Sequence, residues 1–409
     1  MKMRDMRSLL SIHGTVLVAA CAAMAPAGAV AGSLQQLLAE AEFEAGMSTV
    51  LQTIDRHGPN DRRARARLNY RGDVAAALPV GGPGEGSGSF HGHVRFGQGS
   101  GLQARGAHAG AVNGLAFEAD SFAILAQLYY QLEHPLGPGR DGGAQRLELT
   151  VGKIDPFALF DQNAVAGDEA TAFLNSVFVH NALLDAGGDL GADPYGFTPG
   201  VRAAWYGARG SGPGLGASVG LFGTGRGADF SGSPRRPFAI AQLEASPRRA
   251  AGETTGTYRV YRWSNPQAED IDGSPSRHGG WGVSFDQRIG RALKVFGRYG
   301  RRTQGHGRFD KALTFGFEAS GVAWRREQDA IGVGVGLLAT DDIHAPAHAQ
   351  AEGVNRGHSG NERILELFYR FTANRYLDVS PGVQVIRRSG GDPAAPGFLI
   401  AGVRVRIAI

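Results

Sequence analysis

The sequence predicts an all-β protein, a closed antiparallel transmembrane β-barrel, and three observations support this prediction. Several segments alternate apolar and polar residues with a period of two, as strands with two different faces do. Glycine accounts for 63 of the 409 residues, about twice its usual share, and gathers in short runs between those segments. The N-terminus has the features of an export signal. Together these observations indicate an exported chain whose strands close on themselves in a membrane.

The N-terminal residues 1–31 are expected to be a secretory signal peptide. Three basic side chains, Lys2, Arg4 and Arg7, precede a short apolar run at 15–25, and small residues up to Ala31 offer a conventional cleavage site. A cut before Cys21, which would leave a lipidated cysteine, is the competing interpretation. Because Cys21 is the only cysteine, the conventional cut leaves a chain without disulfides or cysteine-based zinc sites.

The charge of the chain gives no indication of nucleic-acid binding. The formal net charge is +4, and the three basic residues of the signal against Asp5 account for +2 of it. The mature chain is therefore close to +2, and what matters is where its arginines lie.

Residues 64–76 show the alternation most clearly. One face carries Ala64, Ala66, Leu68, Tyr70, Gly72, Val74 and Ala76, and the other carries Arg65, Arg67, Asn69, Arg71, Asp73 and Ala75. The same period of two recurs at 89–96, 281–286, 293–300 and 403–409, with glycine-rich runs at 81–88, 210–214 and 390–396. These segments are predicted to be strands, and most of the glycine is predicted to lie in turns.

A soluble β-sandwich would also alternate, so the composition of the two faces has to decide. The apolar face is rich in small residues and the polar face repeats arginine, which suits lipid outside and water inside a barrel. Because every backbone polar group must be paired in hydrocarbon, such a sheet has to close. At roughly 9–11 residues per tilted strand, the chain would accommodate about 14 to 18 strands.

Two stretches depart from this pattern. Residues 34–41 fit either a short amphipathic helix or a linker next to the signal, within an N-terminal segment at 32–62, so the barrel is placed at 63–409. Residues 168–184 show helical spacing after a candidate N-cap at Asp168. A helical insert in a barrel can fold inward, and the region 152–191 is therefore predicted to narrow the lumen.

Several motifs in the same order resemble the carbohydrate-selective (OprB-type) porins of Gram-negative outer membranes. They are GKIDPFALFDQNAVAGDEATAFLN at 152–175, YGFTPGVRAAW at 195–205, GWGVSFDQRIGRALKVFGRYG at 280–300, ERILELFYRF at 362–371 and the closing 382–409. The resemblance covers roughly 120–409. It implies a barrel of about 16 strands that admits glucose and other small sugars by diffusion, with no nucleotide or metal cofactor.

One departure concerns assembly. Outer-membrane barrels usually end in an aromatic residue that the barrel-assembly machinery reads, whereas this chain ends in Ile409 after alternating apolar residues.

The constriction is expected to be lined by polar residues at positions that match the family motif. They are Lys153, Asp155, Asp161, Asn163, Asp168 and Glu169. Charged groups form directional hydrogen bonds to sugar hydroxyls, and a fast pore needs such bonds to be weak. The alternative is structural: Lys153 with Asp155 or Asp161 would pin the insert to the wall.

A basic lining of the lumen is expected opposite them. Its members are Arg65, Arg67, Arg71, Arg95, Arg298, Arg404 and Arg406. Such a surface attracts hydroxylated or weakly anionic solutes, although inward acids such as Asp73, Asp286 and Glu366 would neutralise individual arginines. The tryptophans Trp205, Trp263 and Trp281 fit interfacial girdles better than sugar stacking.

Other functions find less support in the sequence. His91 and His93 share one face but lack an obvious third metal ligand. Asp168 and Glu169 are adjacent, which does not set up the separated carboxylates of glycoside hydrolysis, and no glycine-rich loop continues into Lys-Ser/Thr. The chain is therefore expected not to be an enzyme, to work without cofactors and to meet small sugars and outer-membrane lipids. A general or anion-preferring porin and a secreted glycan-binding β-sandwich remain as alternatives, and a homo-oligomer is left open.

Overall fold

The computed structural model describes residues 41–55, 66–80, 87–102, 111–117, 119–138, 144–185, 195–208, 213–224, 235–247, 255–270, 273–339 and 360–409. In this part of the chain sixteen strands form one closed antiparallel barrel, in which each strand pairs with its neighbours in sequence. The strands are β1 Glu42–Ile54, β2 Ala66–Val80, β3 Ser87–Gln98, β4 Phe122–Pro138, β5 Ala144–Ile154, β6 Thr198–Ala208, β7 Gly214–Phe222, β8 Phe238–Ser246, β9 Gly256–Glu269, β10 Pro275–Ile289, β11 Leu293–Gln304, β12 Lys311–Gly321, β13 Arg326–Ala339, β14 Asn361–Asn374, β15 Leu377–Arg387 and β16 Phe398–Ala408. The fold class and the expected strand number are confirmed.

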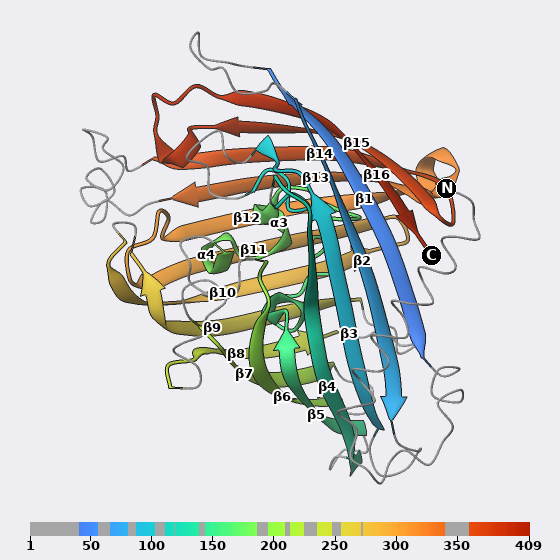
Figure 1. The fold of residues 1–409 in the computed structure, drawn as a ribbon, viewed down its shortest axis with the longest axis vertical. Helices are drawn as coiled ribbons and strands as arrows, with labels where there is room; N and C mark the ends of the chain where they lie inside the picture. Colours follow the sequence, from blue (N-terminus) through green and yellow to red (C-terminus); the bar gives the residue numbers. More distant parts are fainter. Residues whose placement is uncertain are drawn as a thin grey trace.

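The barrel closes between its first and last strands, which lie side by side in Figure 1. β1 pairs with β16 from Gly46 opposite Ala408 to Ile54 opposite Ile400. Beyond the last paired strand residue, the amide of Ile409 donates to the carbonyl of Ala45 at 2.9 Å. The seam therefore leaves no open edge along this stretch.

The barrel begins earlier than residue 63, where the sequence analysis placed it. β1 lies inside the segment 32–62 that was expected to precede the barrel. Its outward face mixes large apolar residues with small or polar ones, since Thr49 stands between Met47 and Leu51. This mixture hides the period of two. The signal peptide at 1–31 and most of the helix expected at 34–41 lie outside the described residues.

Side chains alternate between the lumen and the outer surface as the sequence predicts. In β14, Leu365 and Leu367 are 41% and 42% exposed on the outer face, whereas Glu366 between them is 2% exposed inside. In β16, Val403 points outward and Arg404 is buried inside. The apolar face of each strand therefore meets lipid. None of the helices in the described ranges has the length and hydropathy needed to span a bilayer.

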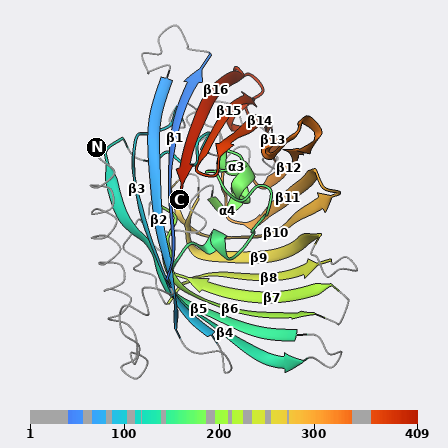
Figure 2. The same cartoon turned by 90° about the vertical axis from the view of Figure 1, so that its right-hand side faces the viewer.

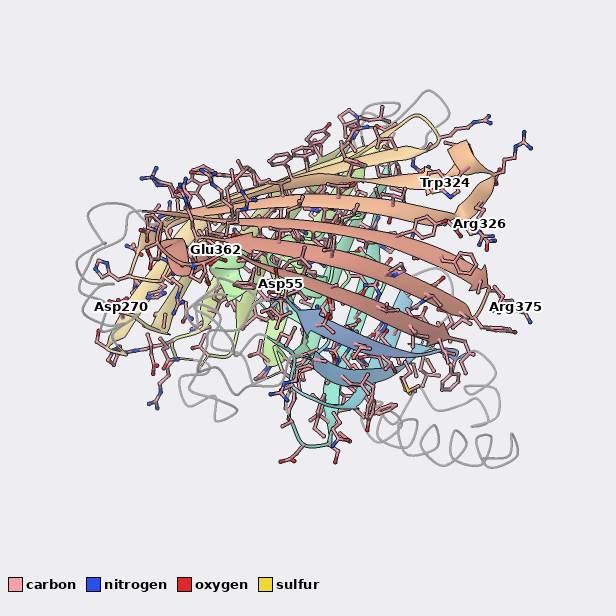
Figure 3. The ribbon with its side chains drawn as sticks, turned by 90° about the horizontal axis from the view of Figure 1, so that it is seen from above. Asp55, Asp270, Trp324, Arg326, Glu362 and Arg375 are labelled. Atoms are coloured by element: carbon pink, nitrogen blue, oxygen red, sulfur yellow. The ribbon has the colours of Figure 1, made fainter. Side chains whose placement is uncertain are left out.

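The two ends of the barrel differ in the length of their connections. At one end β1 begins and β16 finishes, and the connections there include short turns such as 290–292, 322–325 and 375–376. At the other end the connections are long, such as 99–121, 155–197 and 340–360. Figure 3 shows Trp324, Arg326 and Arg375 at the first end and Asp270 and Glu362 toward the second. In outer-membrane barrels short turns are periplasmic and long loops extracellular, which orients the molecule.

Two segments of the long connections fold into the barrel rather than away from it. The described part of the β5–β6 connection, 155–185, lies within the barrel opening with its helices α3 Ser176–Val179 and α4 Ala182–Asp185 (Figure 2). The segment 111–117 of the β3–β4 connection lies beside it, since the Ser176 amide donates to the carbonyl of Ala111. The first inward segment was expected from the sequence, and the second was not.

The expected helix over 168–184 is wrong in its extent. Asp168 caps only a turn, accepting from the amide of Ala170 at 2.8 Å, and the helical residues are two single turns. Each turn begins after an asparagine, where Asn175 accepts from Val177 and Asn181 accepts from Leu183. Because asparagine side chains compete for backbone donors and favour caps, they divide the segment.

Candidate functional site: the lumen and its constriction

The inserted segment is packed against one side of the barrel by aromatic side chains. Phe173 lies 5.3 Å from Phe296 of β11 and 5.1 Å from Phe368 of β14, measured between ring centroids. Phe178 adds a further contact with Phe173 at 5.1 Å. All four rings are almost fully buried, so this part of the barrel interior is an apolar core. We call β11–β16, together with β1, the insert-covered wall.

Inward charges on the insert-covered wall hold the insert by its backbone. Arg298 of β11 donates to the carbonyls of Ala166 and Asp161 at 2.8 and 3.0 Å. Arg404 of β16 donates to the carbonyls of Glu169 and Ala172 at 2.7 and 2.9 Å. These arginines were expected in the basic lumen lining, and the structure places them instead as anchors of the insert.

Glu366 of β14 also anchors the insert, but as a hydrogen-bond acceptor, whereas the two arginines are donors. Its two carboxylate oxygens accept from the amides of Leu174 and Asn175 at 2.7 and 2.9 Å. Gln384 of β15 and Gln52 of β1 both donate to the carbonyl of Val112 in the second inward segment. The wall therefore satisfies the backbone groups of both segments, which buried chain without regular structure requires.

Two residues expected at the constriction turn out to be structural. Asp161 is 1% exposed and Asn163 is 7% exposed. Asp161 pairs with Arg298 at 3.1 Å, and Asn163 donates to the carbonyl of Phe285 in β10 at 2.9 Å. The expected pinning of the insert by an ion pair is therefore present, but its cation is Arg298 and not Lys153. We no longer expect Asp161 and Asn163 to contact solute.

A second part of the interior, on β2 and β3, presents charged groups that face the insert. Asp73 accepts from Arg71 at 2.9 Å, from Arg95 at 2.7 Å and contacts His93 at 2.8 Å. Arg71 also pairs with Glu169 of the insert. Although burial alone would raise it, the pKa of Glu169 is lowered to about 2 by Arg71 and Arg95. This ion-pair network joins the wall to the insert while part of Asp73 stays exposed.

Asp155 of the insert and Lys153 of β5 lie close to this network, since Arg95 and Lys153 both approach the ring of Phe197. Asp155 accepts from the amide of Phe157 at 2.9 Å and caps the short 3-10 turn that follows, and burial raises the pKa of its carboxyl. Lys153 donates to the carbonyl of Leu125 at 3.1 Å, with its ammonium 6.0 Å from the ring centre of Phe197. Both side chains are partly exposed.

The remaining arginines expected in the lining divide into three cases. Arg67 is exposed and shares the inward face of β2 with Arg71. Arg406 of β16 lies 3.6 Å from Asp378 of β15. Arg65 lies outside the described residues. The basic lining is thus present on β2 and β3, where Arg71 and Arg95 are both paired with Asp73.

A further row of inward charges on β5–β10 was not singled out from the sequence, apart from Asp286. Glu148 accepts from Arg146 at 2.9 Å and from Arg202 at 3.0 Å. Arg259 donates to Asp286 at 3.0 Å. The alternation of these strands was the available signal, because each residue occupies an inward position. We call β2–β10 the charged wall; the insert also contacts its strands β8–β10, through Gln242, Tyr261 and Phe285.

Flat side chains lie on the charged wall and on the insert beside it. His91 stacks on Tyr129 with ring centroids 4.6 Å apart, and His180 of the insert stacks on Phe157 at 4.3 Å. Burial lowers the pKa of His180 to about 4, so this ring is neutral near neutral pH. Partly exposed rings give a sugar ring a flat surface to stack on, and the charged groups beside them give its hydroxyls hydrogen-bonding partners.

The tryptophans separate by face. Trp281 is 36% exposed on the outer side and Trp205 shares that side, as a girdle residue would. Trp263 is 1% exposed and packs inside the barrel beside Tyr261, with centroids 6.2 Å apart. The girdle expectation is therefore wrong for Trp263.

Comparison with known proteins agrees with this architecture. A family model described as "Carbohydrate-selective porin, OprB family" matches residues 95–408. Porin B of Pseudomonas aeruginosa is 25% identical over 217 residues, which cover 45% of this chain and 48% of that protein. The match thus spans about half the length of that relative.

Solved structures show the same fold. The high-pH structure of Pseudomonas putida OprB superimposes with a TM-score of 0.71 at 19% identity, covering 92% of this chain and 96% of that one. A mutant porin of Rh. blastica gives a TM-score of 0.50 at 11% identity, covering 90% of this chain and 100% of that one.

Proposed function

Because the chain belongs to the carbohydrate-selective porin (OprB) family, we propose that it lets small carbohydrates such as glucose diffuse passively across the outer membrane. Membership of this family places the chain in the bacterial outer membrane, where a closed barrel presents its apolar face to lipid. A closed barrel also excludes the secreted β-sandwich that the sequence left open. The family is one of channels, and we propose that the chain has no catalytic role.

The observation that supports sugar passage best is the composition of the charged wall beside the insert. Paired charges such as Asp73 with Arg95 supply donors and acceptors, while their mutual neutralisation avoids a strong single-sign field. The rings of Tyr129 on the wall and Phe157 on the insert are both partly exposed. A neutral hydroxylated solute can exchange part of its hydration for such partners and still leave.

We propose that Lys153 of β5, Asp155, Asp168 and Glu169 of the insert, and Arg67 and Arg95 of the wall line the solute path. Arg71 was also expected there, but it is only 5% exposed, and we propose that it holds the insert through Glu169. Asp168 is the weakest member, because its carboxylate already binds the amide of Ala170 and the hydroxyl of Thr171. Outer-membrane lipids and the barrel-assembly machinery are the proposed partners outside the lumen, and 1–31 is the proposed signal peptide.

Liposome swelling tests the proposal. Vesicles containing the purified protein should swell in glucose faster than in a disaccharide, and in a disaccharide faster than in a tetrasaccharide. Arg95→Gln should lower the glucose rate severalfold, because it removes one donor while Arg71 and His93 still hold Asp73. Arg375→Gln, in the two-residue turn at the periplasmic end, is the matched control. Swelling no faster than in protein-free vesicles would reject the proposal.

A general or anion-preferring porin is the second candidate, favoured by the number of inward arginines. The reversal potential in a potassium chloride gradient distinguishes an anion-preferring porin from a sugar pore. A sugar pore whose arginines are paired should give a reversal potential close to zero, whereas an anion pore should give a large one that Arg95→Gln reduces.

A further inference from the structure

The periplasmic end of the barrel carries an arginine in each of three consecutive short turns. Arg291 lies in the turn between β10 and β11, Arg325 in the turn between β12 and β13, and Arg375 in the turn between β14 and β15. All three side chains are exposed. Figure 3 shows Arg375 at the same end of the barrel as Arg326 and Trp324. We call Arg291, Arg325 and Arg375 the turn arginines.

The three turns follow one another along a continuous part of the rim. The amide of Ser320, just before the β12–β13 turn, donates to the carbonyl of Ala292 in the β10–β11 turn at 2.7 Å. On the other side, the guanidinium of Arg326 donates to the carbonyl of Thr372 near the end of β14 at 3.1 Å. Turns that are two strands apart are separated by about 10 Å. The turn arginines therefore lie along one arc of the periplasmic rim.

An exposed apolar side chain accompanies each turn arginine. Ile289, Val322 and Tyr376 lie in or next to the three turns, and all three are exposed. The guanidinium of Arg375 lies 4.4 Å from the ring centre of Tyr376. The turns contain only two to four residues, and each residue extends a chain by at most about 3.6 Å. The turn arginines are therefore held close to the lipid-facing surface, at the level of the lipid headgroups.

The chain neutralises a neighbouring arginine at this end but not the turn arginines. Arg326 pairs with Asp329 at 2.5 Å. Glu327 is the one carboxylate within the described residues 289–293, 321–327 and 373–377, and it forms no ion pair with Arg325. In the part of the chain that the structure describes, the turn arginines pair with no carboxylate. This arc of the rim therefore presents positive charge to the membrane surface.

We propose that the turn arginines bind the phosphate groups of anionic phospholipids in the periplasmic leaflet of the outer membrane. Guanidinium groups match phosphate oxygens in bidentate geometry, and basic residues near an anionic membrane surface are attracted to it. A lipid is favoured over soluble phosphate because an exposed apolar side chain accompanies each arginine and contacts the same lipid molecules. A lipid is favoured over an acidic periplasmic protein because the short turns project little beyond the membrane surface. This surface lies outside the lumen and is independent of the transport proposal.

Binding of phosphatidylglycerol to the detergent-solubilised barrel, followed by native mass spectrometry, tests the proposal. The triple variant replaces the turn arginines by glutamine: Arg291→Gln, Arg325→Gln and Arg375→Gln. Its matched control removes the same charge from exposed positions at the extracellular end: Arg235→Gln, Arg236→Gln and Arg277→Gln. Parallel titrations use phosphatidylcholine, which carries a phosphate but no net charge, and inorganic phosphate. Resistance to heat unfolding in detergent shows that each variant is a folded barrel.

We expect the wild type and the control to bind phosphatidylglycerol with equal affinity and the triple variant to bind it at least about tenfold more weakly, since each basic residue near an anionic surface adds to the affinity. Phosphatidylcholine should bind all three proteins equally, and more weakly than phosphatidylglycerol binds the wild type. Inorganic phosphate should not compete at millimolar concentration.

Equal binding of phosphatidylglycerol by the folded triple variant and the wild type would overturn the proposal, as would an equal loss in the control. Binding of phosphatidylcholine as tight as that of phosphatidylglycerol, or competition by free phosphate, would overturn it as well. If the triple variant does not fold, the pair Arg291→Gln and Arg375→Gln decides, because it leaves in place Arg325, whose φ is 54–62° like that of the other non-glycine residues with positive φ.

Discussion

The insert-covered wall and the charged wall both point arginines inward, yet these arginines bind different partners. Arg298 and Arg404 on the first wall are 3% and 2% exposed and bind backbone carbonyls of the insert. Arg71 and Arg95 on the second wall bind carboxylates; Arg71 is 5% exposed, but Arg95 is 13% exposed and the shared Asp73 keeps 29% of its side chain exposed. An inward position in the sequence thus predicts a polar environment, whereas the packing of the insert decides whether water reaches it.

Energetics should follow the same division. A charge sealed under the insert has no water to replace a lost partner, so removing the partner costs several kcal/mol. A charge that keeps part of its surface in the open lumen, as Asp73 beside Arg95 does, is screened, and losing one of its partners costs little stability. Four experiments test this comparison, each on a different group.

The largest effect is expected for Arg298→Met. The substitution leaves the Asp161 carboxylate, which is fully buried, without its cation, and should lower the free energy of unfolding by about 3–5 kcal/mol. Urea titration of the barrel in lipid vesicles measures it, and single-channel conductance should rise as the insert loosens. The double variant Arg298→Met with Asp161→Asn should recover part of the loss. Stability equal to the wild type in the single variant would show that the wall does not hold the insert as described.

Acidification should weaken the contact between the insert and the charged wall. The pKa of Glu169 is lowered to about 2 from its ordinary value of about 4.3 in an unfolded chain. The ionised Glu169 therefore contributes stability that is complete above about pH 4.3 and is lost as the pH falls toward 2, an effect of about 2–3 kcal/mol. Urea titrations at several pH values should show this slope in the wild type. Glu169→Gln, the control, should lack it, and an identical slope in both proteins would contradict the ion pair with Arg71.

His180 should give a smaller effect in a higher pH range. Burial lowers the pKa of its ring to about 4, so the unfolded chain takes up the proton first. Stability is complete above about pH 6.5 and declines as the pH falls toward 4. The expected loss is about 1–2 kcal/mol, because the ring is partly exposed and water screens the charge. His180→Phe keeps the stacking on Phe157 and should flatten this slope. A slope that persists in the variant would assign it to another group.

The smallest change in stability is expected for Arg95→Gln on the charged wall. Asp73 keeps Arg71 and His93 as partners, so the free energy of unfolding should fall by less than about 1 kcal/mol. Ion selectivity should nevertheless shift toward cations, since an inward positive charge is gone. Measuring the free energy of unfolding and the reversal potential on the same variant shows whether a residue of the charged wall affects selectivity more than stability. A loss as large as that of Arg298→Met would remove the distinction between them.

The barrel itself was predictable from the sequence because the period of two is visible wherever the outer face of a strand is uniformly apolar and its inner face uniformly polar. The strands around 281–286 and 293–300 were recognised from their alternation, and the structure pairs them as a hairpin with Phe285 outside and Arg298 inside. β1 was missed because Thr49 and other small or polar residues interrupt its outer face. A strand that pairs with the far end of the chain also gives no local turn signal.

The candidate site was predictable only in part. The motif at 152–175 located the insert, and Glu169 does pair with an arginine of the wall, Arg71. Asp161 and Asn163 have the same polar character in the sequence, and their burial depends on contacts with β10 and β11 that lie more than a hundred residues away. The inward segment 111–117 carried no motif at all, and its place depends on Gln52, Asn69 and Gln384.

The sequence by itself determined which face of each strand meets lipid, because that choice depends only on alternation along a single strand. It also determined that the inward face carries many arginines. Only the tertiary structure decided which of those arginines are sealed under the insert and which border water, since that depends on where two distant segments pack inside the closed barrel. Burial of a charge is a property of its surroundings in space, and these surroundings come from parts of the chain that no local pattern connects.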